Sequence, residues 1–296
     1  MSAIYSYDDY LTDPFLAAGE LGQLLRNSAL RLFLGAGASS GFGLPEWKLL
    51  IARVLDKDRD SAFLSSLDTM SITDLRRLVD PLDDGSATYV GRVREALYRD
   101  VKADLLEQLQ GSPLLLAVAA LLTGAHRGRI DSVVTYNYDD LLEQYLRMLG
   151  LAVCCRIRPD ELSTRADVEL NYVHGRLPQG WEASMAIPEI ILSEKSYRSR
   201  RAEIESGWPA MIAHGLFSKI GLFVALSGDD SSILDVLKRA QNRVRRSADY
   251  TGYWLLTPDA FDRNKDDILE VGMCPIRLEK EKIAQFVFRI CQCAAS

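Results

Sequence analysis

The sequence lacks several features that mark particular classes of protein. It has no basic excess, because 35 Lys and Arg face 41 Asp and Glu and the formal net charge is −6. Domains that bind nucleic acid are usually basic, so we expect no direct nucleic-acid binding. The longest apolar run, residues 113–125, is too short to span a bilayer and predicts a buried helix. The acidic start of the chain lacks the basic and apolar segments of a secretory signal, so we expect neither export nor a membrane.

Cysteine is also scarce, and no two cysteines have the C-x-x-C spacing of a structural zinc site. The five cysteines are Cys154, Cys155, Cys274, Cys291 and Cys293. The 3 histidines do not have metal-ligand spacing either, so we expect no metal. An odd number of cysteines without a secretory signal is typical of a reducing compartment, which predicts a cytoplasmic protein.

What the sequence does contain is an alternation of strand and helix patterns. Apolar and β-branched runs predict strands at 30–34, 152–158, 168–175, 222–228, 252–257 and 274–278, and a strand, turn and helix over 130–150. Helical spacing separates most of these runs, which predicts an α/β fold with a parallel sheet. Residues 57–128 show helical patterns with hardly any strand signal, so we expect an all-helical insertion within a single domain spanning 1–296. Residues 176–202 are expected to be irregular and polar.

A glycine-rich loop, within RLFLGAGASSGFGLPEW at 31–47, follows the first predicted strand and precedes a predicted helix. Glycines let a backbone approach phosphate groups closely, and N–H groups at a helix start supply hydrogen-bond donors. Ser39 and Ser40 would add hydroxyl donors. Position 40 is serine, however, so the loop departs from the G-x-G-x-x-G pattern. The residues alone leave two interpretations open, a diphosphate cradle or an ordinary turn between strand and helix.

Two further polar residues lie at the ends of predicted strands, where parallel sheets place their ligands. The amide of Asn137 can accept from and donate to one water molecule and so aim it, although helix capping is a common role for asparagine. His174 precedes Gly175, and an imidazole group ordinarily titrates near neutral pH and can accept a proton, although most lone histidines are structural. Asp139 can simply complement the dipole of the following helix, as can Asp140.

These segments occur in an order that resembles the sirtuin family. GAGASSGFGLPEW is similar to the family's NAD-binding loop, TYNYD (135–139) to its Thr-Gln-Asn-x-Asp motif, and VHG (173–175) to its catalytic His-Gly. LFVALSGDD resembles the late segment that holds the adenosine ribose, and the likeness extends from about residue 29 to 278. The resemblance implies a Rossmann-like parallel sheet flanked by helices.

The resemblance also implies roles for individual residues. Asn137 and His174 would be catalytic, with Asn137 orienting a water and His174 taking a proton. Asp139 would contact the nicotinamide carboxamide. The residues expected to contact the rest of NAD are Gly35, Ala36, Gly37, Ser39, Pro45, Trp47, Ser227, Gly228 and Asp229. From the residues alone, Ser227 to Asp229 are equally well explained as a helix cap.

Three departures from the sirtuin pattern bear on the activity. No cysteine lies between His174 and Cys274, so the zinc ribbon of the deacylases is absent from the sequence. Glu46 and Trp47 replace the usual aspartate and phenylalanine, and Tyr136 replaces the glutamine. This pattern resembles the divergent bacterial branch that includes NAD-degrading effectors of anti-phage defence. It implies an NAD glycohydrolase; the alternatives are a protein deacylase or ADP-ribosyltransferase, and a nucleotide-binding sensor or assembly subunit with little turnover.

An NAD glycohydrolase without restraint would drain the cell that makes it, so we expect its activity to be gated. No second domain is evident in the sequence, which predicts a homo-oligomer and an activating partner, such as an ATPase or a nucleic-acid sensor from the same defence locus. The helical block from 60 to 125 is the expected controlling element, because it lies between the glycine loop and Asn137 in the chain. The basic runs 194–203 and 238–247 are expected to be solvated helix faces.

Overall fold

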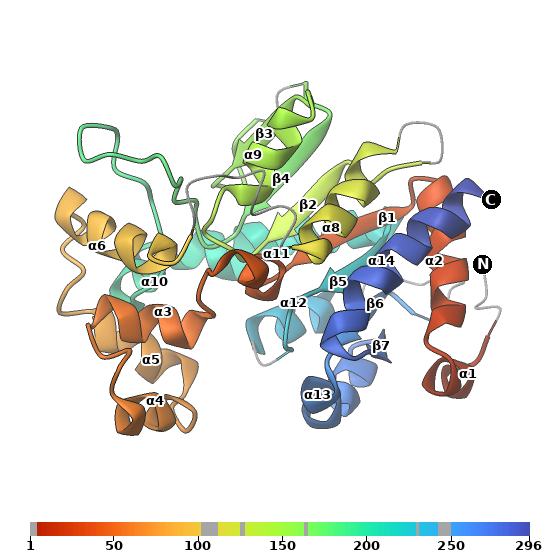
Figure 1. The fold of residues 1–296 in the computed structure, drawn as a ribbon, viewed down its shortest axis with the longest axis horizontal. Helices are drawn as coiled ribbons and strands as arrows, with labels where there is room; N and C mark the ends of the chain where they lie inside the picture. The colour runs from red at the N-terminus through yellow and green to blue at the C-terminus, as the bar shows by residue number, and fades with distance from the viewer. Residues whose placement is uncertain (1–4, 102–111, 125–127, 163–164, 229–230, 242–249) are drawn as a thin grey trace.

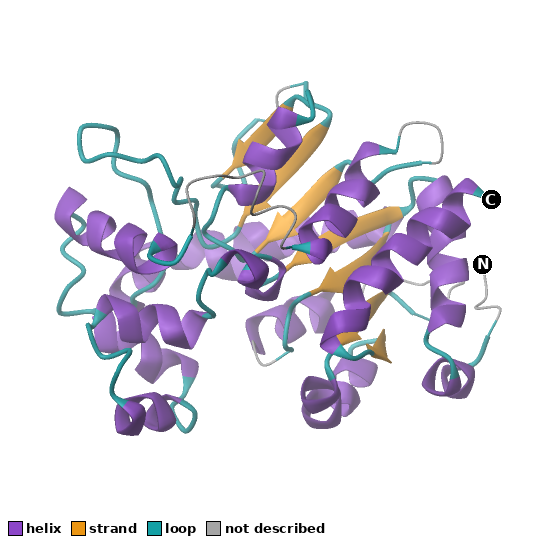
Figure 2. Cartoon of the chain, viewed as in Figure 1, coloured by secondary structure: helices purple, strands orange, loops and turns teal. Residues whose placement is uncertain are grey.

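The structure is a computed structural model, and it describes residues 5–101, 112–124, 128–162, 165–228, 231–241 and 250–296. Within them a 7-stranded sheet has the order β3-β4-β2-β1-β5-β6-β7, and every neighbouring pair of strands is parallel (Figures 1 and 2). The strands are β1 (Leu30–Leu34), β2 (Ser132–Thr135), β3 (Val153–Arg156), β4 (Val168–Tyr172), β5 (Ile220–Val224), β6 (Gly252–Leu256) and β7 (Met273–Arg277). The predicted α/β fold with a Rossmann-like parallel sheet flanked by helices is therefore confirmed.

Helices cover both faces of this sheet, and side chains alternate between the two faces along each strand. On β1, Leu30, Leu32 and Leu34 belong to one core, whereas Phe33 belongs to the other. The first core includes residues of α2 (Phe15–Arg26), α8 (Pro113–Thr123), α9 (Leu141–Met148) and α14 (Lys280–Ala295). The second includes residues of α11 (Trp208–Ser218), α12 (Ser231–Gln241) and α13 (Pro258–Glu270). Burial on both faces explains why the strands are nearly continuous apolar runs.

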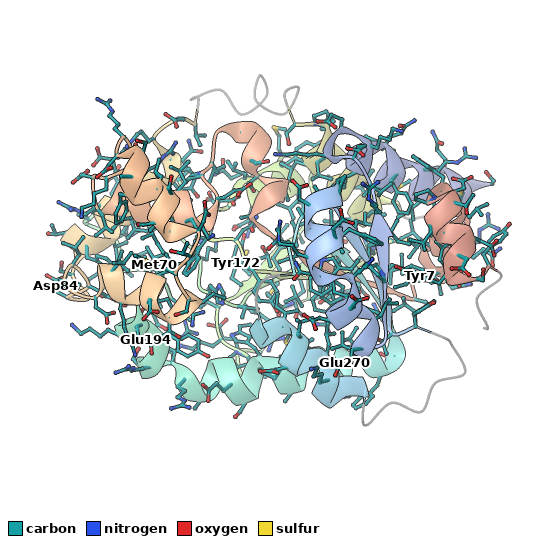
Figure 3. All side chains as sticks on the ribbon, turned by 90° about the horizontal axis from the view of Figure 1, so that it is seen from below. Tyr7, Met70, Asp84, Tyr172, Glu194 and Glu270 are labelled. Carbon is teal, nitrogen blue, oxygen red and sulfur yellow. The ribbon has the colours of Figure 1, made fainter. Side chains whose placement is uncertain are left out.

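Five helices form a separate group at one end of the sheet, which we call the helical lobe. They are α3 (Trp47–Val54), α4 (Ser61–Leu67), α5 (Ile72–Val79), α6 (Ala87–Tyr98) and α10 (Glu194–Ser199). The helical lobe lies on the left in Figure 1, and Figure 3 places Met70, Asp84 and Glu194 at this end and Tyr7 at the other. Capping residues mark where α4, α5 and α6 begin. The side chains of Asp60, Ser71 and Ser86 each accept a hydrogen bond from the backbone N–H three residues later.

The predicted insertion, 57–128, contributes α4, α5 and α6 to the helical lobe, whereas α8 from the same stretch packs on α14 and α9. Residues 176–202 were expected to be irregular, but a capping box at Ser193 and Ser196 starts the short helix α10 there. The remaining elements are α1 (Tyr7–Thr12), η1 (Ala36–Ala38), η2 (Ser40–Phe42) and η3 (Glu203–Gly207). None of the helices in the described part of the chain has the length and apolarity that crossing a membrane requires.

Candidate functional site

The sheet has its topological switch point at β1. The next strand in the chain, β2, lies on one side of β1, and β5 lies on the other side. In open α/β sheets ligands bind outside the carboxyl ends of the strands at such a point. The glycine loop follows β1 directly, so it lies at this position. We call the ends of β4, β2, β1 and β5 together the carboxyl edge.

Close packing against β5 fixes the start of the glycine loop. The N–H of Gly35 donates to the carbonyl of Val224 at 3.1 Å. A Cβ at Gly35 would lie 2.3 Å from the carbonyl oxygen of Ala225, and a Cβ at Gly37 would lie 3.1 Å from Ala225 Cβ. Ala225 itself has a φ of +59°, an uncommon conformation for a residue with a side chain. Close approach to β5 therefore already requires glycine at position 35, whether or not a ligand binds.

The hydroxyls of the loop are used inside the protein. Ser40 Oγ donates to the carbonyl of Gly37 at 2.9 Å. Ser39 is only 3% exposed, and its Oγ accepts from the Nδ2 of Asn137 at 3.3 Å. Ser39 also hydrogen-bonds the carboxylate of Asp139. The loop and the segment after β2 are thus joined at a buried polar cluster of Ser39, Asn137 and Asp139.

Asn137 is the member of this cluster that has an unused hydrogen-bond acceptor. Its backbone N–H donates to Thr135 Oγ1 at 3.1 Å, and its Nδ2 is directed at Ser39. Its Oδ1 is buried without a hydrogen-bond partner among the described residues. Buried acceptors are rarely left unpaired, so this oxygen is suited to a water or a ligand hydroxyl. Asn137 is not the cap of α9, because the residue at that position is Asp140.

Burial dominates the electrostatics of Asp139. Desolvation raises the pKa of its carboxyl from 3.8 to about 6, although hydrogen bonds from Ser39 and from the N–H of Leu141 act in the opposite direction. The Leu141 N–H lies 3.2 Å from Asp139 Oδ1, within the first turn of α9. The expected dipole contact is therefore present. In addition, this carboxyl can change protonation near neutral pH.

His174 follows β4, the strand next to β2. Its ring meets Tyr136 edge-on, with 5.5 Å between ring centroids, and lies 6.4 Å from the ring of Tyr138. The two tyrosines flank Asn137 in the chain, so the structure brings the two motifs to the same part of the carboxyl edge. Gly175 has a φ of +88°, and a Cβ there would lie 1.9 Å from the carbonyl oxygen of Glu189. This turn therefore requires glycine, and it fixes where the backbone of His174 leaves the strand.

The other predicted contacts are more spread out. Ser227 is exposed beyond β5, its carbonyl accepts from Asn264 Nδ2 at 3.0 Å, and Gly228 has a φ of +87°. Asp229 lies outside the described residues. Pro45 is buried ahead of α3, and Trp47 packs against the first core as the first residue of that helix.

A cavity of about 580 Å³ adjoins the second half of the glycine loop. It is lined by Ser40, Gly43, Leu44, Pro45, Glu46, Lys48, Leu49, Arg53, Leu64, Leu67, Asp68 and Asp100. Of the predicted contacts it includes Pro45, whereas Asn137 and His174 do not line it. The cavity therefore separates the loop from α4 of the helical lobe rather than enclosing the buried polar cluster.

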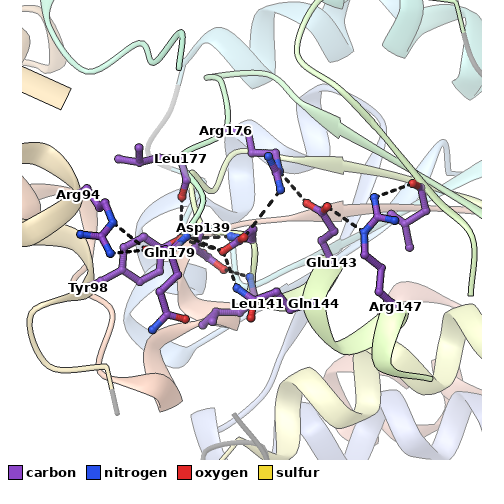
Figure 4. Close-up of polar contacts among 12 residues, drawn as sticks. Arg94, Tyr98, Asp139, Leu141, Glu143, Gln144, Arg147, Arg176, Leu177 and Gln179 are labelled. Atoms are coloured by element: carbon purple, nitrogen blue, oxygen red, sulfur yellow. Dashed lines mark hydrogen bonds and ion pairs between the residues drawn. The ribbon is translucent and has the colours of Figure 1, made fainter. Parts of the chain in front are cut away.

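The sequence did not reveal the connections of Asp140, for which only a dipole role was expected. Its Oδ1 accepts from Gln144 Nε2 at 2.9 Å and from the N–H of Gln179 at 3.0 Å (Figure 4). Arg176 lies 3.8 Å from its other oxygen, and the hydroxyl of Tyr98 is also within reach. Asp140 therefore joins the segment after β2 to the segment after β4. No local pattern in the sequence marks such contacts.

Within the described residues, no three or more His, Cys, Asp and Glu side chains are grouped so as to hold a metal ion. A family model described as "SIR2-like domain" matches residues 131–283, just over half of the chain. The match begins before β2 and extends into α14, so it includes Asn137, Asp139 and His174, whereas the glycine loop precedes it. No curated protein matches the chain.

Proposed function

Because the chain belongs to the SIR2-like domain family, we propose that it is an NAD glycohydrolase, which hydrolyses NAD to nicotinamide and an ADP-ribose product. Asn137 carries this proposal. Its side chain is held from one end by Ser39, while the buried Oδ1 at the other end has no partner among the described residues. An amide fixed in this way can hold one water molecule in a defined direction. Such positioning can supply a large part of the rate acceleration when the bond has a good leaving group.

The reaction follows from the chemistry of the bond. Cleavage between C1′ of the ribose and nicotinamide develops positive charge on the sugar, as in other glycosidic cleavages. Nicotinamide leaves with the bonding electron pair, the oxygen of water bonds to C1′, and one proton is released. Asn137 Oδ1 orients the water, and the imidazole of His174 accepts the proton. Neither step requires a metal.

The remaining parts of NAD have candidate positions along the carboxyl edge. Backbone N–H groups of Ala36 and Gly37 would meet the diphosphate, since the hydroxyls of Ser39 and Ser40 already have partners. Ser227 and Gly228 would contact the adenosine ribose from the end of β5. Asp139 would contact the carboxamide of nicotinamide. With a pKa of about 6, this carboxyl is mostly ionised above pH 7 and would accept a hydrogen bond from the carboxamide, whereas the neutral acid, which can donate one, predominates below that pKa.

The proposed biological role is that of a gated, cytoplasmic effector of bacterial anti-phage defence, which acts as a homo-oligomer under the control of a partner protein. Its support is the resemblance to the divergent sirtuin-like branch. The test measures NAD turnover by the isolated protein together with its mass in solution. We expect an oligomer with a low resting rate that rises with a partner or with assembly. A monomer with full turnover that is harmless when expressed would contradict this role.

One experiment separates the proposed activity from its rivals. Purified protein is incubated with NAD, with and without an acylated lysine peptide and a candidate activator, and the products are identified by mass spectrometry. Nicotinamide with free ADP-ribose, formed without any peptide, is the expected result. Dependence on the acyl peptide with release of O-acyl-ADP-ribose would instead identify a deacylase, and ADP-ribose attached to protein a transferase. Binding of NAD without turnover under all conditions would identify a sensor.

A further inference from the structure

Tyr98, the last residue of α6, makes contacts that its position on the helix does not predict. Its side chain is buried among residues far away in the sequence. The hydroxyl donates to the carbonyl oxygen of Leu177 at 2.7 Å and accepts from the backbone N–H of Asp140 at 3.3 Å. Asp140 Oδ1 lies 3.2 Å from the same hydroxyl. One phenol oxygen therefore contacts the segment after β2 and the segment after β4 at the same time (Figure 4).

These two segments also bind each other beside Tyr98. The N–H of Leu177 donates to the carbonyl of Tyr138 at 2.7 Å, and the N–H of Gln179 donates to Asp140 Oδ1 at 3.0 Å. A second residue of α6 takes part, since Arg94 Nε donates to the carbonyl of Gln179 at 2.7 Å. The end of α6, the segment after β2 and the segment after β4 are thus joined to one another by hydrogen bonds.

We propose that Tyr98 is a positioning residue, whose hydroxyl fixes the segment Asn137–Asp140 and the segment His174–Gln179 relative to each other and to the helical lobe. Its consequence for catalysis rests on the proposed function. The hydroxyl touches neither reacting group; it acts through the backbone of the two segments that carry them. A misplacement of about 1 Å can lower turnover by roughly 100-fold in enzymes whose groups must be aligned. Loss of the contacts of one hydroxyl is therefore enough to change the rate.

The same helix also contacts α3. Arg53 of α3, the helix that follows the loop, forms an ion pair with Asp100 and donates from Nη1 to the carbonyl of Ala96 at 3.3 Å. Ala96 and Asp100 lie on either side of Tyr98 at the end of α6. The helical lobe therefore hydrogen-bonds the segments after β2 and β4 through α6, and its helix α3 continues the chain directly from the glycine loop. A shift of α6 would alter the geometry of Asn137 and His174 together, which gives the lobe a physical route to control the site.

The test compares Tyr98→Phe with Tyr89→Phe. Tyr89 is also a buried tyrosine of α6, but its hydroxyl has no hydrogen-bond partner among the described residues. Both variants remove one buried phenol oxygen from the same helix, so only the lost contacts differ. Two readouts are taken under the same conditions. One is hydrogen–deuterium exchange of peptides covering 136–141 and 174–180, and the other is kcat and KM for NAD with the affinity for ADP-ribose.

We expect Tyr98→Phe to exchange faster in both peptides, to lose about 10- to 100-fold in kcat, and to keep KM and ADP-ribose affinity within roughly threefold of wild type. Tyr89→Phe should match wild type in every readout. Equal exchange and equal kcat in the two variants would overturn the inference while leaving the proposed function intact. If Tyr98→Phe exchanges faster but the wild-type chain never cleaves NAD, the proposed function is refuted, while the inference that Tyr98 holds the two segments together stands.

If Tyr98→Phe fails to fold, Arg94→Gln replaces it. Arg94 is only partly buried and contacts one of the two segments, at Gln179. Faster exchange confined to 174–180, with a smaller fall in kcat, would support the inference. Unchanged exchange in both peptides would overturn it.

Discussion

The hydroxyl of Ser39 lies 3.3 Å from the amide nitrogen of Asn137, a residue 98 positions further along the chain. This contact joins the glycine loop to the segment after β2. It engages the amide nitrogen, so that Oδ1 is the amide atom available to a water or ligand. Ser39 is therefore better suited to aligning Asn137 than to contacting a phosphate, because its side chain is buried and its hydroxyl is already engaged. The loop contributes to the proposed reaction through this one side chain as well as through its backbone.

Asn137→Ala removes the amide that would orient the water. We expect NAD turnover to fall by about 100-fold or more, as for other lost positioning groups. The free energy of unfolding should change by only about 1 kcal/mol, since one long hydrogen bond is lost and an unpaired acceptor is removed with it. Product formation and thermal unfolding are measured side by side.

Asn27→Ala is the control for Asn137→Ala. Asn27 is an exposed asparagine at the end of α2, ahead of β1 and hence at the opposite edge of the sheet. Turnover near the wild-type level in Asn137→Ala would remove the catalytic assignment. A comparable loss in Asn27→Ala would mean that the assay reports folding instead.

His174→Ala should lower turnover by about 100-fold for a different reason, the loss of a proton acceptor. The matched control is His214→Ala, because His214 is exposed on α11 and contacts the ring of Phe217. Turnover near the wild-type level in His174→Ala would assign the proton to another group.

The raised pKa of Asp139 predicts a pH dependence of stability. Its pKa is about 6 in the folded chain and ordinarily 3.8, so between these values the folded chain holds a proton that the unfolded chain has lost. Stability should therefore fall as pH rises through this window and stay low above it. Asp139→Asn should be more stable than wild type at pH 8 by about 1–3 kcal/mol, and this gain should vanish toward pH 4.

Urea unfolding across this pH range measures the effect, with Asp84→Asn as the control. Asp84 is fully exposed and its pKa is lowered by hydrogen bonds from Ser86, so its substitution should lower stability above pH 4. A stability difference for Asp139→Asn that does not vary with pH would show that burial does not raise this pKa.

Packing rather than ligand binding explains one of the loop glycines. Gly35→Ala places a Cβ against the carbonyl of Ala225 and should destabilise the chain by about 1–3 kcal/mol even without NAD. The control is Gly19→Ala in the interior of α2, where a Cβ meets nothing within 4 Å and a gain of about 0.5–1 kcal/mol is expected. Unfolding midpoints that shift equally in both variants would contradict the close approach of the loop to β5.

The sequence predicts the sheet well because its strands are buried on both faces, which leaves continuous apolar runs. It places the start of β5 later than the structure does, because Gly221 interrupts the run, although this glycine is needed where the ring of Phe223 packs. The six-residue helix α10 falls in a stretch for which the sequence supports both an irregular segment, over 176–202, and a helix face, over 194–203, because its residues are polar and only its cap marks it.

The candidate site divides in a similar way. Asn137 and His174 stand in local motifs and could be identified from the sequence. The contact of Ser39 with Asn137 spans 98 residues and that of Tyr98 with Leu177 spans 79. Hydrogen bonds at such separations leave no periodic pattern, and a tyrosine buried in a helix looks like any other core residue. The residues that hold the motifs in place therefore emerge only from the folded chain.

Asp140 tests whether the two motif segments depend on each other. Asp140→Ala leaves the N–H of Gln179 and the amide of Gln144 without their acceptor, which should cost about 1–3 kcal/mol of stability for the two partly buried donors together. Asp140→Asn keeps an oxygen at the same place and loses only the charge near Arg176, which also pairs with Glu143 at 2.6 Å. We therefore expect Asp140→Asn to retain most of the stability and Asp140→Ala to lose it, with NAD turnover following the same order. The free energy of unfolding in urea and the NAD turnover are measured for both variants and compared. Equal losses in the two variants would mean that the charge, and not the hydrogen bonds to Gln179 and Gln144, holds the segments together.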